Sequence, residues 1–310
     1  MAKILIVGCG AVGSVLACKL SRLHELTAYD KDCNLVKIIK RNGIKLYGAK
    51  QNYKINITDK IDDIKTLDFD LIIFATKCYN VVESTNKITK CCSSSRILYI
   101  QNGLIDIDSI QKNLPDTVVY SGILMMAAYT TKKGEINASK KGTIYLGSTK
   151  ASDKDLSLMK DVFSKAGFKS VAVKDPAQVI WAKLIFSSVM NPFPILVNSD
   201  YNIIRNNKDC CILIRRAIEE GKKVAKKLGI RLYFDPLNIV DDIRNGKYRK
   251  FHHMGSMYYD FINHRITEND YITGKLVQEA KRLNIKVPTL EVIYRLVKIL
   301  ENRRMGNGKR

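Results

Sequence analysis

The sequence predicts an α/β protein in which a doubly wound parallel sheet is followed by an all-helical C-terminal domain. Three observations predict this fold. Short apolar runs alternate with helical periodicity through the first half of the chain, a glycine cluster joins the first run to the first helix, and helical periodicity continues alone beyond Lys174. A chain of 310 residues can bury two cores of ordinary size. We therefore expect domains at residues 1–174 and 175–310.

The expected elements follow the apolar pattern in chain order. Apolar runs predict strands at 3–7, 26–29, 71–75, 96–100, 118–126 and 143–146, with an antiparallel pair around 132–134. Helical spacing predicts helices at 11–23 and 34–42 in the first domain, and at 176–191, 210–228, 257–264, 271–283 and 289–300 in the second. The alternation of strands and helices favours right-handed crossovers, with helices on both faces of one sheet.

Composition and charge place the chain among soluble globular proteins. Apolar residues make up 46% of the chain, and lysine plus arginine outnumber aspartate plus glutamate by 52 to 30. The formal charge of +22 would attract polyanions, but the pattern shows no helix-turn-helix, zinc finger or alternation of aromatic and basic residues. We therefore expect a lysine-rich surface and no nucleic-acid partner. Without a signal-peptide core or an uninterrupted apolar stretch of about 18 residues, we expect a cytoplasmic protein with no membrane partner.

The eight cysteines do not indicate a metal site. They form no C-x-x-C pair, and no histidine stands at metal-ligand spacing from them. Cys91 and Cys92 are adjacent in the sequence, as are Cys210 and Cys211, and adjacent cysteines have a poor geometry for a disulfide. We expect reduced thiols and no bound metal.

A dinucleotide-binding motif follows the first expected strand. Gly8-Cys9-Gly10-Ala11-Val12-Gly13 is a G-x-G-x-x-G between that strand and the first helix. The first glycine permits a tight turn, the second lets a pyrophosphate approach the backbone, and the third lets helix and strand pack closely. The pyrophosphate then lies at a helix N-terminus, where free N–H groups and the helix dipole favour negative charge. We therefore predict a Rossmann-type domain that binds cofactor through this loop.

The residues after the second expected strand bear on which dinucleotide is bound. Asp30 ends that strand, where a carboxylate can accept hydrogen bonds from the ribose hydroxyls of NAD(H). Lys31 follows directly, and its charge could instead pair with the 2′-phosphate of NADP(H), which Asp30 would repel. The preference between NAD(H) and NADP(H) stays open at this stage, with a slight physical advantage for NAD(H).

Further short motifs stand in order along the chain. They are Ala75-Thr76-Lys77, Gln101-Asn102-Gly103, Trp181-Ala182-Lys183-Leu184, Asn191-Pro192, Ser256-Met257 and Glu268-Asn269-Asp270-Tyr271-Ile272-Thr273-Gly274. With the glycine loop, these motifs resemble the ketopantoate reductase family, the 2-dehydropantoate 2-reductases. The resemblance covers nearly the whole chain, from Lys3 to about Val297.

The resemblance implies reduction of the 2-keto group of ketopantoate to pantoate with NADPH, a step toward pantothenate and coenzyme A. In the family, the lysine that corresponds to Lys183 donates the proton. This role is chemically sound, because hydride addition to a keto carbon creates an alkoxide that a nearby ammonium group can stabilise and protonate. Periodicity alone would make Lys183 an ordinary surface lysine, and only the motif around Trp181 favours catalysis.

The resemblance also assigns binding roles to other side chains. Its substrate-binding residues are Asn102, Lys183, Ser187, Asn191, Ser256 and Glu268. Its cofactor-binding residues, beside the glycine loop and the pair Asp30 and Lys31, are Lys77, Asn102, Ala128 and Glu268. Asn102 also follows an expected strand end, where open parallel sheets bind ligands. Asn191 stands about two helical turns after Lys183, on a similar face.

The sequence departs from the family pattern in three places. Ser187 stands where many relatives have asparagine, which keeps a donor but shortens its reach. The segment 197–203 lacks the usual glycine, so the second substrate asparagine is either Asn198 or Asn202. His252-His253-Met254-Gly255 precedes Ser256 in place of smaller polar residues. These changes put ketopantoate specificity in doubt more than the chemistry.

Two alternatives therefore remain beside ketopantoate reduction. One is reduction of another small 2-keto acid on the same scaffold, which the altered positions favour. The other is a non-catalytic protein that senses a dinucleotide and uses its basic surface on an acidic partner, which the charge of +22 favours. The oligomeric state, a homodimer included, stays open.

Overall fold

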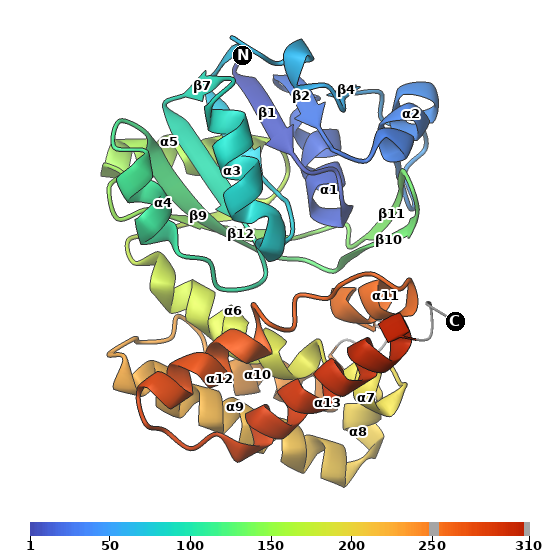
Figure 1. Cartoon of the computed structure of the whole chain (residues 1–310), viewed down its shortest axis with the longest axis vertical. Coiled ribbons are helices and arrows are strands. Elements are labelled where there is room, and N and C mark those ends of the chain that lie inside the picture. Colours follow the sequence, from blue (N-terminus) through green and yellow to red (C-terminus); the bar gives the residue numbers. More distant parts are fainter. Residues whose placement is uncertain (248–253, 307–310) are drawn as a thin grey trace. The chain divides into compact units, whose positions relative to one another are not determined.

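The computed structural model describes residues 1–247 and 254–306, and His252 and His253 lie outside the described residues. The chain forms two compact units (Figure 1). The first contains Met1–Gln101 and Ile105–Pro176, and the second contains Asn102–Leu104 and the chain from Ala177 onward. The short segment Asn102–Leu104 thus leaves the first unit between β8 (Arg96–Ile100) and α4 (Ile107–Asn113).

An eight-stranded sheet forms the centre of the first unit, and it confirms the predicted fold class. Its strand order is β13-β12-β9-β8-β6-β1-β2-β4. Beside β8, the strands are β1 (Lys3–Val7), β2 (Glu25–Tyr29), β4 (Asn56–Thr58), β6 (Leu71–Phe74), β9 (Val118–Met125), β12 (Thr143–Gly147) and β13 (Lys169–Val173). All neighbours are parallel except β9 and β12, which pair antiparallel.

Helices cover both faces of this sheet because successive side chains of each strand point to opposite sides. On β1, Ile4 and Ile6 join the core that includes buried residues of α1 (Ala11–Leu20) and α5 (Asp153–Lys165). Leu5 and Val7 join the opposite core, which α3 (Val81–Thr89) and α4 complete. Strands buried on both faces need continuous apolar sequence, which is why the pattern predicted β1 and β6 closely.

Two smaller sheets complete the first unit. The expected antiparallel pair is a hairpin of β10 (Ala128–Lys132) and β11 (Glu135–Ala138), but it pairs with β3 (Lys45–Leu46) in a separate sheet. Strands β5 (Asp68–Phe69) and β7 (Ser93–Ser94) form a two-stranded sheet. The remaining elements of this unit are α2 (Cys33–Asn42), η1 (Ile61–Asp63) and η2 (Cys78–Asn80).

The described part of the second unit is helical, as predicted. Its helices are α6 (Pro176–Met190), α7 (Phe193–Val197), α8 (Ile203–Asn206), α9 (Lys208–Lys227), α10 (Pro236–Arg244), α11 (Ser256–Ile262), α12 (Thr273–Arg282) and α13 (Pro288–Gly306). The span Pro176–Val197 is long and apolar enough to cross a membrane, but 72% of its most apolar window is buried inside the structure. Such burial is typical of a core helix.

The buried carboxylate of Glu220 on α9 holds the first turn of α13. Its Oε1 accepts a hydrogen bond from the backbone N–H of Thr289 (3.0 Å), and its Oε2 accepts one from Leu290 (2.9 Å). Pro288, which has no N–H to satisfy, begins the helix. A negative group at a helix N-terminus also interacts favourably with the helix dipole. Glu220 therefore fixes the start of α13 against α9.

We predict that Glu220→Ala lowers the free energy of unfolding of the second unit by about 1–3 kcal/mol, because two N–H groups lose their acceptor. Trp181, the single tryptophan, is buried in the core of this unit and reports its unfolding by fluorescence in urea.

Glu219→Ala is the matched control, because Glu219 is the exposed neighbour that pairs with Lys222 at 3.0 Å. Its loss is expected to cost less than about 1 kcal/mol. Equal destabilisation by the two changes would contradict the capping role of Glu220.

Candidate active site

The glycine loop turns the chain from β1 into α1 within three residues. Gly8 has φ of 96°, a conformation that residues with side chains rarely adopt. A Cβ on Gly13 would lie 1.8 Å from the carbonyl oxygen of Gly8, whereas a Cβ on Gly10 would meet nothing within 4 Å. The turn is therefore closely packed at Gly13 and open at Gly10. These are the features that the pyrophosphate of a dinucleotide requires.

Asp30 lies half-buried just after β2 and binds the glycine loop directly. Its Oδ2 accepts a hydrogen bond from the backbone N–H of Cys9 (2.6 Å), and its Oδ1 accepts one from Asp32 (2.9 Å). Each carboxylate oxygen can accept a further hydrogen bond, so the ribose hydroxyls of a dinucleotide fit here. Sequence reasoning gave Asp30 the ribose and missed its structural role on the loop. Burial and the nearby charge of Asp30 raise the pKa of the Cys9 thiol.

Two lysines lie beside residues 30–32, and their polar contacts differ. Lys133 Nζ lies 2.6 Å from Oδ2 of Asp32, which also caps α2. Partial burial alone would raise the pKa of Asp32, but hydrogen bonds from Lys133 and from backbone N–H groups of α2 lower it. Lys31 is exposed, and its Nζ donates to the neutral amide oxygen of Asn80 at 3.3 Å. Because the Asn80 amide is neutral, this contact differs from the ion pair that Lys133 makes with Asp32.

Gln101 joins the ends of two neighbouring parallel strands, β6 and β8. It is 7% exposed, and its Nε2 donates to the carbonyl oxygens of Phe74 (2.9 Å) and Thr76 (3.4 Å). Half-buried Lys77 follows Thr76 and precedes η2. The sequence motif that contains Gln101 gave a role to Asn102 alone. A polar amide directly after an apolar strand could have indicated the structural role of Gln101. Ala128 begins β10 and is half-buried.

In the second unit, α6 presents Lys183 and Ser187 one turn apart. Lys183 is half-buried, and Ser187 is 4% exposed. The backbone N–H of Asn191 donates to the carbonyl oxygen of Ser187 at 3.1 Å, so the helical path continues to Asn191. Residues at this spacing share one face of a helix. The structure therefore brings these three side chains to one side of α6 and its end.

Asn191 lies beside the segment that leads into Ser256. Ser256 is the first residue of α11, and Gly255 before it has φ of 78°. A Cβ on Gly255 would lie 3.4 Å from Oδ1 of Asn191 and 2.4 Å from the hydroxyl oxygen of Tyr201. Burial raises the pKa of Tyr201 well above its usual range. Nothing in the sequence indicated that Tyr201 lies beside Gly255. Its position between Asn198 and Asn202 was the only signal that could have drawn attention to it.

Glu268 lies in the loop between α11 and α12 and is 5% exposed. Its carbonyl oxygen accepts hydrogen bonds from the N–H groups of Tyr271 and Ile272, both at 3.0 Å. The Thr273 hydroxyl donates to the carbonyl oxygen of Ser188 on α6 at 2.9 Å. The loop that carries Glu268 is thus tied to the helix that carries Lys183.

Asn102 belongs to the same unit. Two residues further on, the N–H of Leu104 donates to the carbonyl oxygen of Tyr271 at 2.9 Å. The second unit therefore collects all six substrate-binding residues that the sequence predicted. The first unit holds the glycine loop, Asp30, Lys31, Lys77 and Ala128.

The two candidates for a second substrate asparagine differ in environment. Asn198 ends α7, is exposed, and accepts a hydrogen bond from the hydroxyl of Tyr258 at 3.3 Å. Asn202 is half-buried, and its side-chain amide donates to Asp200 at 3.1 Å. The choice between the two stays a prediction.

Two family matches cover most of the chain. Residues 4–151 match the family described as ketopantoate reductase PanE/ApbA, and residues 175–301 match its C-terminal family. The chain is 29% identical over 299 residues to a 2-dehydropantoate 2-reductase of Pyrococcus abyssi, with 96% of this chain and 97% of that protein covered.

Solved structures share the fold. A ketopantoate reductase of Ralstonia eutropha JMP134 has a TM-score of 0.85 at 21% identity, covering 98% of this chain and 99% of that one. D-mandelate dehydrogenase with NADH and anilino(oxo)acetate has a TM-score of 0.88 at 24% identity, covering 97% and 99%. The chain therefore belongs to the ketopantoate reductase PanE/ApbA family and is an NAD(P)H-dependent oxidoreductase.

Proposed function

We propose that this protein reduces ketopantoate to pantoate with NADH or NADPH, in the cytoplasm, and supplies pantothenate and coenzyme A biosynthesis. The observation that carries the proposal is the gathering of Asn102, Lys183, Ser187, Asn191, Ser256 and Glu268 in one unit. Family membership and the name of the Pyrococcus abyssi relative support the substrate.

In this proposal Lys183 is the general acid. NADH or NADPH, held by the glycine loop, would supply the hydride that converts the C=O bond of the keto acid to a C–O single bond. Lys183 stabilises the negative charge that develops on the oxygen and then donates the proton that completes the hydroxyl group. Half-burial beside the apolar neighbours of α6 strengthens this electrostatic interaction, because fewer water molecules compete.

The other polar side chains hold the substrate. Ser187 and Asn191 extend from Lys183 along one face of α6, and the Asn191 amide lies beside the entry to Ser256. Hydroxyl and amide groups can donate to the carboxylate of a 2-keto acid and accept from its hydroxyl group. Glu268, which can only accept when ionised, suits a substrate hydroxyl. Together they would fix the keto carbon before hydride transfer.

Reduction of a different 2-keto acid is the second candidate. Ser187 shortens the reach of a substrate-binding side chain, and the fold is shared with D-mandelate dehydrogenase. Both candidates use the same proton donor and differ in what the side chain of the keto acid contacts. A panel of 2-keto acids, with loss of reduced-nicotinamide absorbance as the readout, separates them.

We predict that Lys183→Met lowers kcat by roughly 10²–10⁴-fold with little change in cofactor affinity, because it removes the proton donor. Steady-state kinetics and a cofactor titration measure the two quantities. Lys226→Met, which removes an exposed lysine of α9, is the control and should keep normal kcat. Normal kcat in Lys183→Met would exclude Lys183 as the general acid.

The glycine loop yields a prediction that separates binding from folding. Gly10→Ala should fold normally, since its Cβ meets no atom, but should weaken cofactor binding because the methyl group occupies the side open to the pyrophosphate. Gly13→Ala should destabilise the first unit by about 3 kcal/mol or more, because its Cβ collides with backbone. Thermal unfolding measures the stability of both variants, and a cofactor titration measures their affinity for the cofactor. Tight cofactor binding by Gly10→Ala would contradict the proposed position of the pyrophosphate.

Cofactor preference should depend on Asp30 and Lys31. Asp30→Asn removes the charge that repels a 2′-phosphate and weakens the hold on the ribose hydroxyls, so the ratio of NADPH to NADH affinity should rise. Lys31→Ala should weaken NADPH binding and leave NADH binding nearly unchanged. Dissociation constants for both cofactors measure this, and an unchanged ratio in both variants would place the ribose elsewhere.

A further inference from the structure

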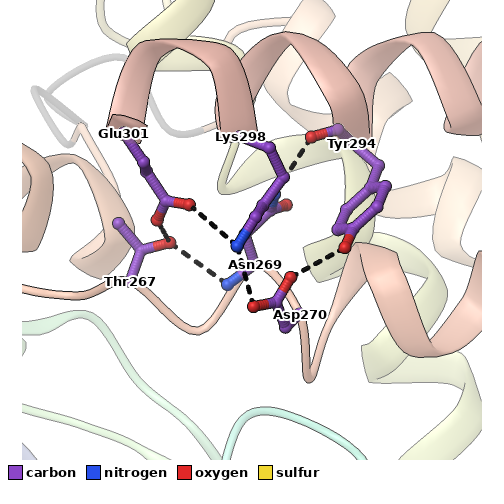
Figure 2. Close-up of polar contacts among 6 residues, drawn as sticks. All are labelled: Thr267, Asn269, Asp270, Tyr294, Lys298 and Glu301. Carbon is purple, nitrogen blue, oxygen red and sulfur yellow. Dashed lines mark hydrogen bonds and ion pairs between the residues drawn. The ribbon is translucent and has the colours of Figure 1, made fainter. Parts of the chain in front are cut away.

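We propose that Lys298 and Glu301 on α13 are positioning residues that hold Glu268 in place for the substrate. The inference rests on the proposed function for the role of Glu268, and it deepens that function by naming the residues through which the loop is fixed. We call six residues that join the Glu268 loop to α13 the α13 clamp. They are Thr267, Asn269, Asp270, Tyr294, Lys298 and Glu301 (Figure 2).

The residue before Glu268 is bound to the C-terminal half of α13. The Thr267 hydroxyl donates to Oε1 of Glu301 at 2.5 Å, and Thr267 is 4% exposed. The same hydroxyl oxygen accepts the backbone N–H of Asn269 at 3.1 Å. Thr267 thus links α13 to the backbone on the far side of Glu268.

The two residues after Glu268 are bound to the same helix. Asp270 accepts hydrogen bonds from the Tyr294 hydroxyl (2.8 Å) and from Lys298 Nζ (2.9 Å). Asn269, which is 1% exposed, donates through Nδ2 to the carbonyl oxygen of Tyr294 at 3.1 Å. Glu268 is therefore held between neighbours that are all attached to α13.

One helix face supplies the three partners. Tyr294, Lys298 and Glu301 follow the i, i+4, i+7 spacing that places residues on one side of a helix. Lys298 also lies 3.7 Å from Glu301, so the two ends of the clamp are connected. Partial burial alone would lower the pKa of Lys298, but the hydrogen bond and charge of Asp270 outweigh burial and raise it. Lys298 is thus a cation throughout the neutral pH range.

The helix is itself a firm base for these contacts. Leu290, Ile293 and Val297 bury its inner face in the core of the second unit, and Glu220 binds its first turn. A loop between two helices would otherwise lose its fixed geometry to conformational entropy. A displacement of about 1 Å at a substrate-positioning group can cost about two orders of magnitude in rate, so such attachments matter for catalysis.

The test uses the full-length enzyme and a double-mutant cycle. Lys298→Met should lower kcat/KM for the best keto acid of the panel by roughly 10-fold, with an unfolding temperature close to that of the unaltered protein. Glu268→Gln should lower it further. The double variant Glu268→Gln/Lys298→Met should lose no more than Glu268→Gln alone, because Lys298 acts through Glu268. A merely structural role would make the two losses multiply.

Two variants control for loss of charge and of packing. Arg295→Met breaks the ion pair with Glu291 (2.8 Å) on the same helix without touching the loop, and it should keep kcat/KM within about twofold. Lys298→Arg keeps a cation for Asp270 and should recover most of the activity that Lys298→Met loses. Glu301→Gln tests the other end of the clamp and should act in the same direction as Lys298→Met.

Amide hydrogen exchange of residues 266–272 tests the inference without using activity. Exchange should become faster in Lys298→Met and stay unchanged in Arg295→Met. Unchanged exchange in Lys298→Met, kcat/KM within twofold of normal, or multiplied losses in the double variant would each overturn the inference. If the unaltered enzyme reduces no keto acid, the proposed function fails, and the exchange measurement alone then decides whether the clamp fixes the loop.

Discussion

The close approach of Gly13 to the carbonyl oxygen of Gly8 is the contact on which the arrangement of β1 and α1 in the first unit depends. It lets only three residues separate the end of β1 from the start of α1, so the free N–H groups of the helix start lie at the edge of the sheet. Asp30, which follows β2, then accepts a hydrogen bond from the Cys9 N–H and fixes the loop from its other side. The backbone N–H groups at this turn are the ones that we propose bind the pyrophosphate.

Carboxylates that bind backbone N–H groups recur in both units. Asp30 binds the glycine loop, Asp32 caps α2, and Glu220 holds the first turn of α13. Hydrogen bonds of this kind are stronger than those between neutral groups. The chain has 30 acidic residues against 52 basic ones, so these backbone contacts use the scarcer kind of charged side chain.

The sequence predicted elements whose burial leaves a regular apolar pattern, and it missed those whose burial is irregular. Strand β1 lies between two layers of helices, so its apolar run is continuous. Edge strand β13 has only Val173 fully buried, so its sequence shows no such run. Helix α10 was missed although Asp235-Pro236 is a common helix start, and Asp235 does cap it. The error there was one of interpretation, because the necessary residues were present.

The motifs predict site residues, but they do not predict what surrounds those residues. The motifs named Asn102 and Glu268 separately, whereas the hydrogen bond between Leu104 and Tyr271 that brings their segments together joins distant parts of the chain. No local pattern encodes such a contact. The same holds for the α13 clamp, because helical spacing can show that Tyr294, Lys298 and Glu301 share a face, but it cannot show that the face binds the loop of Glu268.

The proposed proton donor, Lys183, lies on a helix that is attached to the loop of Glu268. That helix, α6, is a core helix. The Glu268 loop is tied to it through Thr273, and to α13 through the hydrogen bond between Thr267 and Glu301. Of the positions that depart from the family pattern, Ser187 is buried one turn from Lys183 on the same helix, whereas Asn198 ends α7 and is exposed. In the proposed function, a change at either position would alter the groups that contact the keto acid and would leave Lys183, the proposed proton donor, in its place on α6. The proposed chemistry would then depend on the core helix, and the identity of the keto acid on the side chains around it.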